Sequence, residues 1–139
     1  MTISRTKGLH EADKLAGHLL VIDDDDSFRD ALCELLRDDG FEVDTASHAT
    51  AAVQQLKTKK FDVVLSDLIM PGNGHFVVEY VRSHQPDTPV IVISSHESSS
   101  QALASRGWRS VACLSKPVRF AEVQQALEQA IHHSTGHSS

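Results

Sequence analysis

The chain alternates between short apolar runs and longer segments in which apolar residues recur every three or four positions. Most of the runs are rich in valine or isoleucine and several are nearly continuous, which is typical of strands buried on both faces. The runs cover residues 19–22, 41–46, 61–65, 90–93 and 111–114. Helical spacing between them predicts an α/β fold, in which a parallel sheet carries helices on both of its faces.

The helical spacing is clearest after the first run and at the end of the chain. The apolar stripes there are Phe28, Leu32, Leu35 and Leu36, and Phe120, Val123 and Leu127. Gly40 follows the first stripe and is expected to end that helix. A shorter stripe starts at Phe76, and weaker helical patterns cover residues 49–58 and 98–106, so the sequence predicts five strands and five helices.

The length of 139 residues suits one compact domain with short tails. Residues 1–17 show no sustained apolar period, and residues 133–139 are polar and lack core-forming side chains. We therefore expect a flexible arm over 1–17, a domain over 18–132, and a tail or the start of a linker over 133–139.

The composition excludes several classes of function. With 13 basic and 19 acidic residues, the net charge is −6, so no net positive field favours direct binding of nucleic acid. The longest apolar runs are too short to cross a bilayer, which argues against a membrane protein. Cys33 and Cys113 fit neither a metal-binding spacing nor a disulfide framework, so we expect a cytoplasmic location.

Reactive side chains stand directly after four of the apolar runs. Asp23 to Asp26 follow the first run, Ser66 and Asp67 the third, Ser94 to His96 the fourth, and Ser115 and Lys116 the fifth. In an open parallel sheet, ligands bind beyond the carboxyl ends of the strands. We therefore expect these groups to meet at one end of the sheet, with at least three carboxylates among them.

Carboxylates held close together repel one another unless a cation offsets their charge or one of them is protonated. A hard divalent cation such as Mg²⁺ relieves this repulsion and takes oxygen ligands. A lysine adds fixed positive charge, and a serine hydroxyl adds a hydrogen-bond donor. A carboxylate nucleophile with these partners suits the transfer of a phosphoryl group, in which catalysis is mostly positioning and charge neutralisation.

Four segments carry a resemblance to a known family. LLVIDDDDSFRDAL, FDVVLSDLIMPGNG, PVIVISSH and LSKPV are similar to segments of the receiver domains of two-component response regulators, and they stand in the same order. The resemblance spans about residues 19–131. It implies a flavodoxin-like, doubly wound five-stranded parallel sheet with the strand order 2-1-3-4-5, an order that the alternation of elements alone does not predict.

The resemblance also implies a phosphoacceptor and a metal site. Asp67 matches the aspartate that receives a phosphoryl group from a sensor histidine kinase or a histidine phosphotransfer protein. Asp23, Asp24 and Asp67, with the backbone carbonyl of Ile69, match the ligands of Mg²⁺, which Mn²⁺ could replace. Asp25 falls beyond the acidic pair and, with the aspartate after it, is assigned to a solvated loop.

Two further residues match the groups that contact the phosphoryl group. Ser94 corresponds to the hydroxyl that hydrogen-bonds it and Lys116 to the ammonium that pairs with it. The bond between Lys116 and Pro117 is typically cis in the family. His96 is close enough to the expected site to influence hydrolysis of a phosphoryl aspartate. An output domain, where one exists, would follow residue 139 in a longer chain.

Cys113 departs from the family pattern. The position three before the lysine usually holds an aromatic residue that moves inward on phosphorylation, and a small side chain cannot do this. We therefore expect phosphorylation to be retained but its signal to spread differently, by way of the helix near 98–106. The loop over 72–74 is also shorter than usual, and the segment 107–116, with Trp108, is longer.

Two other functions fit parts of the sequence. Asp23 and Asp25 have the D-x-D spacing of haloacid-dehalogenase-like phosphatases, in which Asp23 would be the nucleophile, but only Glu122 and Glu128 follow to supply the later acidic pair of that class. The second alternative is a receiver-like docking module with weakened or lost switching, which the presence of Asp67 argues against. Under the favoured hypothesis the protein is not an enzyme, because it assists only its own phosphorylation and dephosphorylation.

Overall fold

The computed structural model describes residues 17–67, 74–95 and 112–136. The strands are β1 (His18–Ile22), β2 (Glu42–Ala46), β3 (Val63–Ser66), β4 (Val90–Ser94) and β5 (Ala112–Ser115). The helices are α2 (Asp26–Asp38), α3 (Ala49–Thr58), α4 (Gly74–His84) and α6 (Phe120–Gly136). All five predicted strands are confirmed, as are four predicted helices, and the helix expected near 98–106 lies outside the described residues.

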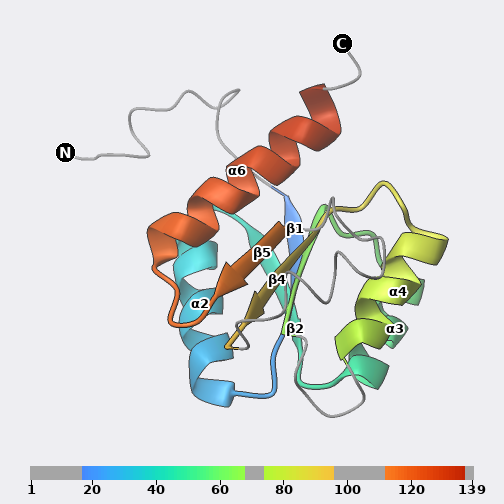
Figure 1. The fold of residues 1–139 in the computed structure, drawn as a ribbon, viewed down its shortest axis with the longest axis horizontal. Coiled ribbons are helices and arrows are strands. Elements are labelled where there is room, and N and C mark those ends of the chain that lie inside the picture. The colour runs from blue at the N-terminus through green and yellow to red at the C-terminus, as the bar shows by residue number, and fades with distance from the viewer. Residues whose placement is uncertain (1–16, 68–73, 96–111, 137–139) are drawn as a thin grey trace.

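The strands form one parallel sheet in the order β2-β1-β3-β4-β5 (Figure 1). The register pairs Ile22 at the end of β1 with Ala46 of β2 and Ser66 of β3, and it pairs Ser94 of β4 with Ser115 of β5. The flavodoxin-like order is therefore confirmed. Because all strands run the same way, their last residues share one end of the sheet.

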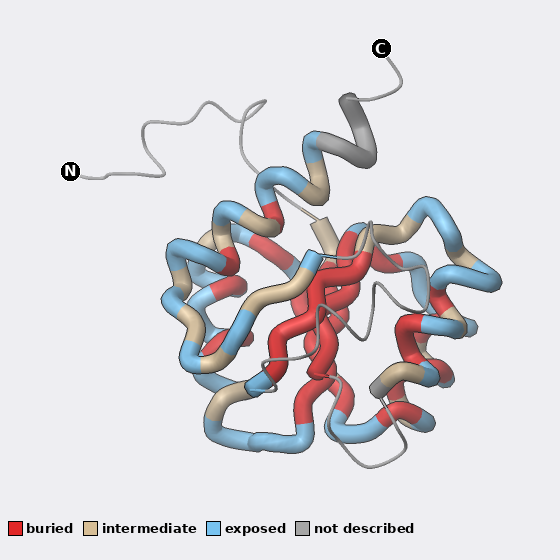
Figure 2. Tube along the Cα trace, in the orientation of Figure 1, coloured by how far each residue is buried: buried red, intermediate tan, exposed pale blue. Residues whose placement is uncertain are grey.

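The helices cover the sheet from both sides. In Figure 1, α2 and α6 lie against one face, and α3 and α4 lie against the other. Neighbouring residues of β1 point into different cores: Leu19 packs in the core under α2 and α6, and Leu20 packs in the core under α3 and α4. Burial on both faces explains why this run is continuously apolar. Strands β1, β3 and β4 form the buried centre of Figure 2, whereas the residues of β5 are exposed or intermediate in burial.

Helix α2 has a distinct signal at each end. At its start, the carboxylate of Asp25 accepts a hydrogen bond from the backbone N–H of Phe28. At its end, the N–H of Gly40 donates to the carbonyl of Arg37, and the N–H of Phe41 donates to that of Leu36, which is the Schellman pattern. Gly40 has a φ of 101°, a conformation that glycine adopts without strain, so the predicted helix end is confirmed.

Some boundaries of strands and helices differ from the predicted ones. Phe41 donates its N–H to α2, so β2 begins one residue later than expected. Strand β3 begins at Val63, two residues later than expected, although the N–H of Asp62 donates to the carbonyl of His18 in β1 and the side chain of Asp62 accepts from the N–H of His18. Helix α6 continues to Gly136, past the expected start of the tail at 133, because each added residue gains a backbone hydrogen bond.

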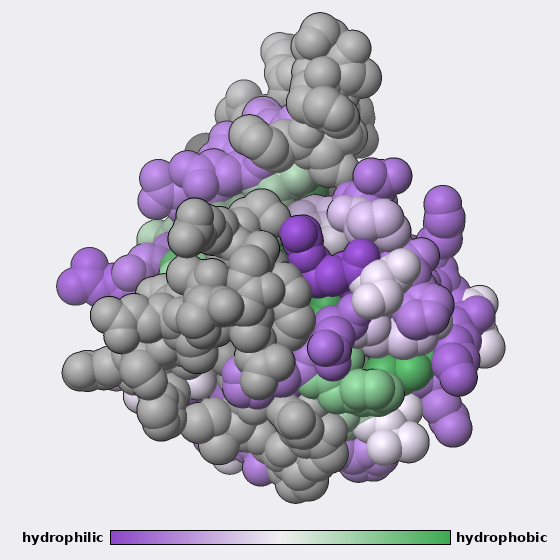
Figure 3. Space-filling view, turned by 45° about the vertical axis from the view of Figure 1, so that its right-hand side comes forward, coloured by the Kyte–Doolittle hydropathy of each residue, from purple (hydrophilic) through white to green (hydrophobic). Residues whose placement is uncertain are grey.

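The described surface offers little continuous apolar area. Leu35 and Phe76 are the exposed large apolar residues of the described part, at 44% and 47% exposure. Where Figure 3 colours the face turned forward, hydrophilic side chains predominate around a smaller apolar area. No helix in the described ranges combines the length and apolar character needed to span a bilayer.

Candidate functional site

Asp23 and Asp67 occupy equivalent positions, each directly after a strand of the sheet. The N–H of Asp23 donates to the carbonyl of Ala46 at 3.1 Å, and the N–H of Asp67 donates to that of Ile22 at 3.0 Å. These bonds continue the strand pairing by one residue and hold both backbones in place. The side chains are buried within the carboxyl end of the sheet, with exposures of 2% for Asp23 and 6% for Asp67.

Three carboxylates form an acidic cluster at this end of the sheet. One oxygen from each of Asp23, Asp24 and Asp67 lies within 4.8 Å of the others. Asp24 is exposed, whereas the other two are buried, so the cluster opens to solvent on one side. Oxygen donors at this separation fit a hard divalent cation that keeps some of its water ligands, as Mg²⁺ does.

Lys116 reaches the acidic cluster from the end of β5. Its Nζ lies 2.8 Å from Oδ2 of Asp23 and 3.3 Å from Oδ2 of Asp67. Its backbone N–H donates to the carbonyl of Ser94 at 2.9 Å, and the bond to Pro117 is cis, as expected. The lysine therefore bridges the two buried carboxylates.

The charge of Lys116 is favoured by these neighbours. Burial by itself would lower the pKa of Lys116, but the hydrogen bond and negative charge of Asp23, together with those of Asp67, outweigh it and raise the pKa. The side chain is 18% exposed, so water screens the contacts only in part. Lys116 thus stays a fixed positive charge beside Asp67.

Ser94 is the last residue of β4 and is buried at 1% exposure. Its pairing with Ser115 and its carbonyl bond to Lys116 place it at the same end of the sheet as the acidic cluster. The structure thus brings five of the predicted site residues to one end of the sheet: Asp23, Asp24, Asp67, Ser94 and Lys116. Ile69, His96 and Trp108 lie outside the described residues.

The start of α2 contributes three residues to the site whose contacts the sequence did not predict. Asp25 is exposed and lies before the helix, which it caps, and its own N–H donates to Oδ1 of Asp23 at 2.9 Å. Asp26, expected in the same loop, is instead the first residue of α2. Arg29 donates to the backbone carbonyl of Asp23 at 2.8 Å and pairs with Asp26 at 2.7 Å. Phe28, predicted only as a core residue, places its ring beneath the ammonium of the site lysine.

A capping signal in the sequence could have predicted one of these roles, that of Asp25. An aspartate three residues before an apolar stripe is a frequent helix start, so the role of Asp25 was accessible to sequence reasoning. The contacts of Phe28 and Arg29 were not, because they depend on the angle at which α2 leaves the sheet.

Cys113 is partly buried and packs against the core under α3 and α4. Burial raises the pKa of its thiol, so the side chain stays protonated and acts as a small apolar group. The segment by which we expect the signal to spread instead lies outside the described residues.

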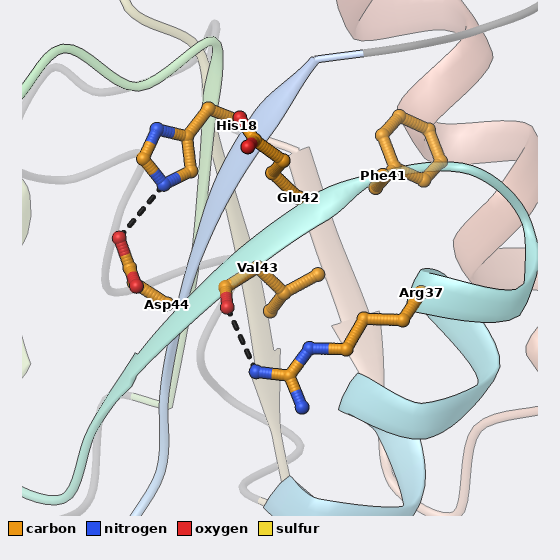
Figure 4. A pocket seen from close by; sticks show the side chains of 6 residues that line it. All are labelled: His18, Arg37, Phe41, Glu42, Val43 and Asp44. Carbon is orange, nitrogen blue, oxygen red and sulfur yellow. Dashed lines mark hydrogen bonds and ion pairs between the residues drawn. The ribbon is translucent and has the colours of Figure 1, made fainter.

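A hollow of about 450 Å³ lies at the opposite end of the sheet (Figure 4). It is lined by His18, Arg37, Phe41, Glu42, Val43 and Asp44. Several of its polar groups bond one another: His18 lies 2.7 Å from Asp44, and Arg37 donates to the carbonyl of Val43 at 2.8 Å. None of the predicted site residues lines this hollow, and its bonded groups stabilise the sheet.

Comparison with known proteins finds one family along most of the chain. A family model described as the response regulator receiver domain matches residues 19–128. The transcriptional regulatory protein GlrR of Escherichia coli (strain K12) is 32% identical over 118 residues, which cover 84% of this chain and 27% of GlrR. The transcriptional regulatory protein FixJ of Bradyrhizobium diazoefficiens is 31% identical over 119 residues, which cover 85% of this chain and 58% of FixJ.

A solved structure extends the likeness to three dimensions. The response regulator TrrA of Thermotoga maritima, in complex with Mg(2+)-BeF, has a TM-score of 0.74 at 26% identity. The match covers 81% of this chain and 97% of that one. The chain spans about a quarter of the length of GlrR, so what GlrR does outside the matched region is not carried over.

Proposed function

The chain belongs to the response regulator receiver family, and on that premise we propose that Asp67 is its phosphoacceptor. The phosphoryl group would come from a phosphohistidine of a sensor histidine kinase or a histidine phosphotransfer protein. The observation that carries the proposal is the position of Asp67, a buried carboxylate that shares Lys116 with Asp23 and faces Asp24. A receiver domain is a signalling domain, and its phosphorylation would switch partner or output interactions.

In the transfer step, an oxygen of Asp67 forms a bond to phosphorus while the phosphorus–nitrogen bond of the donor breaks. The electron pair of that bond stays on the histidine nitrogen. Lys116 is positioned to neutralise the negative charge of the phosphoryl oxygens, because its ammonium already lies 3.3 Å from Asp67. The hydroxyl of Ser94 would donate a hydrogen bond to the same group.

Receiver domains bind Mg²⁺ at an acidic pocket, and the acidic cluster here fits that ion. The residues that would hold it are Asp23, Asp24 and Asp67, with the backbone carbonyl of Ile69, and Mn²⁺ could take its place. When bound, the ion supplies positive charge that offsets the carboxylates and the oxygens of the incoming group.

The remaining expectations form part of the proposal. The receiver domain would cover residues 18–132, and an output domain would lie in a longer chain. A cytoplasmic location is proposed because response regulators generally act there. The phosphatase alternative loses support, because Asp25 caps α2 and Asp23 is engaged by Lys116.

Phosphorylation by a small donor tests the proposal. The intact mass of the protein should gain one phosphoryl group in acetyl phosphate and Mg²⁺, and Asp67→Asn should abolish the gain. Asp25→Asn is the matched control: it neutralises a nearby acid but keeps a capping side chain, so it should react like the wild type. An unmodified wild type, or a phosphoryl group mapped to Asp23, would contradict the proposal.

A further inference from the structure

The ring of Phe28 lies under the ammonium of Lys116, with Nζ 4.4 Å from the ring centroid. The two residues belong to different elements, since Phe28 is in the first turn of α2 and Lys116 follows β5. We propose that Phe28 is a positioning residue for phosphoryl transfer, which holds the Lys116 ammonium over the site through the face of its ring. This inference rests on the proposed role of Asp67.

The position of the ring is determined by the protein and not by a ligand. The N–H of Phe28 donates to the capping carboxylate of Asp25 at 3.1 Å, which fixes the first turn of α2. The side chain is partly buried and packs against the core under α2 and α6. Arg29, the next residue, donates to the backbone of Asp23 and ties the same turn to the acidic cluster. The ring therefore presents a preformed surface to the lysine.

A fixed partner for Lys116 matters because its two carboxylate partners change during the reaction. Asp23 lies 2.8 Å away and would share its charge with a metal ion, and Asp67 lies 3.3 Å away and on phosphorylation would exchange its carboxylate charge for charge on the more distant phosphoryl oxygens. A lysine side chain is flexible, so weaker carboxylate contacts would let the ammonium move away. The ring of Phe28 does not change, and its negative face attracts the cation throughout.

The attraction depends on the ring and not on apolar volume. A cation is drawn to the quadrupole of an aromatic ring, which an aliphatic side chain of similar size lacks. Tyr or Trp in place of Phe28 should therefore keep the lysine in position, whereas Leu or Met should fill the space without holding it.

The first test compares rates of phosphorylation at Asp67 by acetyl phosphate in Mg²⁺. Phe28→Leu and Phe28→Met should each react about three- to tenfold more slowly than the wild type, and Phe28→Tyr should react at close to its rate. Phe61→Leu is the matched control, because it makes the same change in a buried ring near the amino end of β3. It should lower stability while leaving the rate within about twofold of the wild type.

The second test observes the lysine itself in the metal-free, unphosphorylated protein. The ring should shift the Lys116 side-chain proton signals upfield in NMR spectra, an effect that Phe28→Tyr keeps and that Phe28→Leu and Phe28→Met remove. Equal rates for Phe28→Leu, Phe28→Met and the wild type, or unshifted Lys116 signals in the wild type, would overturn the positioning role alone. A wild type that is never phosphorylated would instead overturn the proposed function and this inference with it.

Discussion

At the scale of single residues, charge crowding distinguishes this site from the rest of the molecule. Two carboxylates, Asp23 and Asp67, are nearly fully buried, and a third, Asp24, lies within reach of both. Lys116 contacts the two buried ones and offsets only part of their charge. An arrangement of this kind favours function over stability, because neutralising one of the acids would relieve repulsion.

Asp67→Asn should therefore stabilise the protein in metal-free buffer. The substitution removes one buried negative charge and leaves the 2.8 Å pair of Lys116 and Asp23 in place. We expect the free energy of unfolding to rise by about 1 kcal/mol, measured by urea denaturation with EDTA present. A loss of stability instead would show that Asp67 makes a net favourable contribution to the fold.

Asp44 should make stability depend on pH at the other end of the sheet. Burial by itself would raise the pKa of Asp44, but hydrogen bonds from Lys59 and His18 outweigh it and lower the pKa. The stabilisation is then complete above the pKa of the unfolded chain and is lost as the pH falls through the lower pKa of the folded state. Because Asp44 is 30% exposed, the contribution should stay below about 1 kcal/mol.

Urea denaturation of wild type and Asp44→Asn across the acidic range measures this contribution. The stability difference should shrink as the pH falls toward about 3, because protonated Asp44 no longer carries the charge that its contacts with Lys59 and His18 stabilise. Asp87→Asn, in an exposed turn, is the control and should track the wild type at every pH. A difference that does not vary with pH would contradict the role of the Asp44 charge.

At the scale of elements, α2 links the core to the site. Its first turn carries Asp25, Phe28 and Arg29, which contact Asp23 or Lys116. The rest of the helix packs against the sheet through buried residues such as Leu32 and Leu36. The helix therefore fixes the site from a rigid base, and a substitution that removes the capping side chain should lower stability, whereas one that keeps a capping group should not change the chemistry.

Asp25→Ala should lower the free energy of unfolding by about 1 kcal/mol, because the N–H of Phe28 loses its capping partner. Urea denaturation measures this loss. Glu34→Ala, on the exposed side of the same helix, is the control and should change stability by less than about 0.5 kcal/mol. Equal effects of the two substitutions would show that the cap contributes nothing.

The sequence predicted the strands well because continuous apolar runs such as 90–93 are buried on both faces. It predicted strand starts less well, since Phe41 and Phe61 are as apolar as the strand residues although their backbones lie outside the ladder. The polar end of α6 was also missed, because helix propagation does not require apolar side chains.

For the site, sequence reasoning identified which residues meet but not how they are bonded. Parallel pairing brings Asp23 and Asp67 to one end of the sheet wherever the strand order is known. Lys116 contacts Asp23 more closely than Asp67, and its ammonium lies over the ring of Phe28. These contacts depend on side-chain directions that no spacing in the sequence encodes.

At the scale of the whole molecule, the two ends of the sheet differ in what they can bind. At the amino end, the ammonium of Lys59 pairs with Asp44 and His18 contacts the same carboxylate, so this acid is partnered within the protein. At the carboxyl end, acidic groups outnumber the lysine that pairs with them in the described part. A cation should therefore stabilise the molecule by binding at the carboxyl end.

Mg²⁺ should raise the free energy of unfolding of the whole domain. At a concentration about 100-fold above its dissociation constant, the gain should be about 2.7 kcal/mol, measured by thermal or urea denaturation. Asp24→Asn should remove most of the gain, and Asp25→Asn should keep it, because only the first removes an oxygen ligand from the acidic cluster. Equal gains in the two variants would place the ion elsewhere.

A crystal structure with Mg²⁺ and beryllofluoride most directly tests the central claim that the acidic cluster holds a cation next to the phosphoacceptor. We predict Mg²⁺ at about 2.1 Å from carboxylate oxygens of Asp24 and Asp67, beryllofluoride on Asp67, and Lys116 paired with a fluorine. Beryllofluoride on another residue, or a metal ion away from these aspartates, would contradict the account.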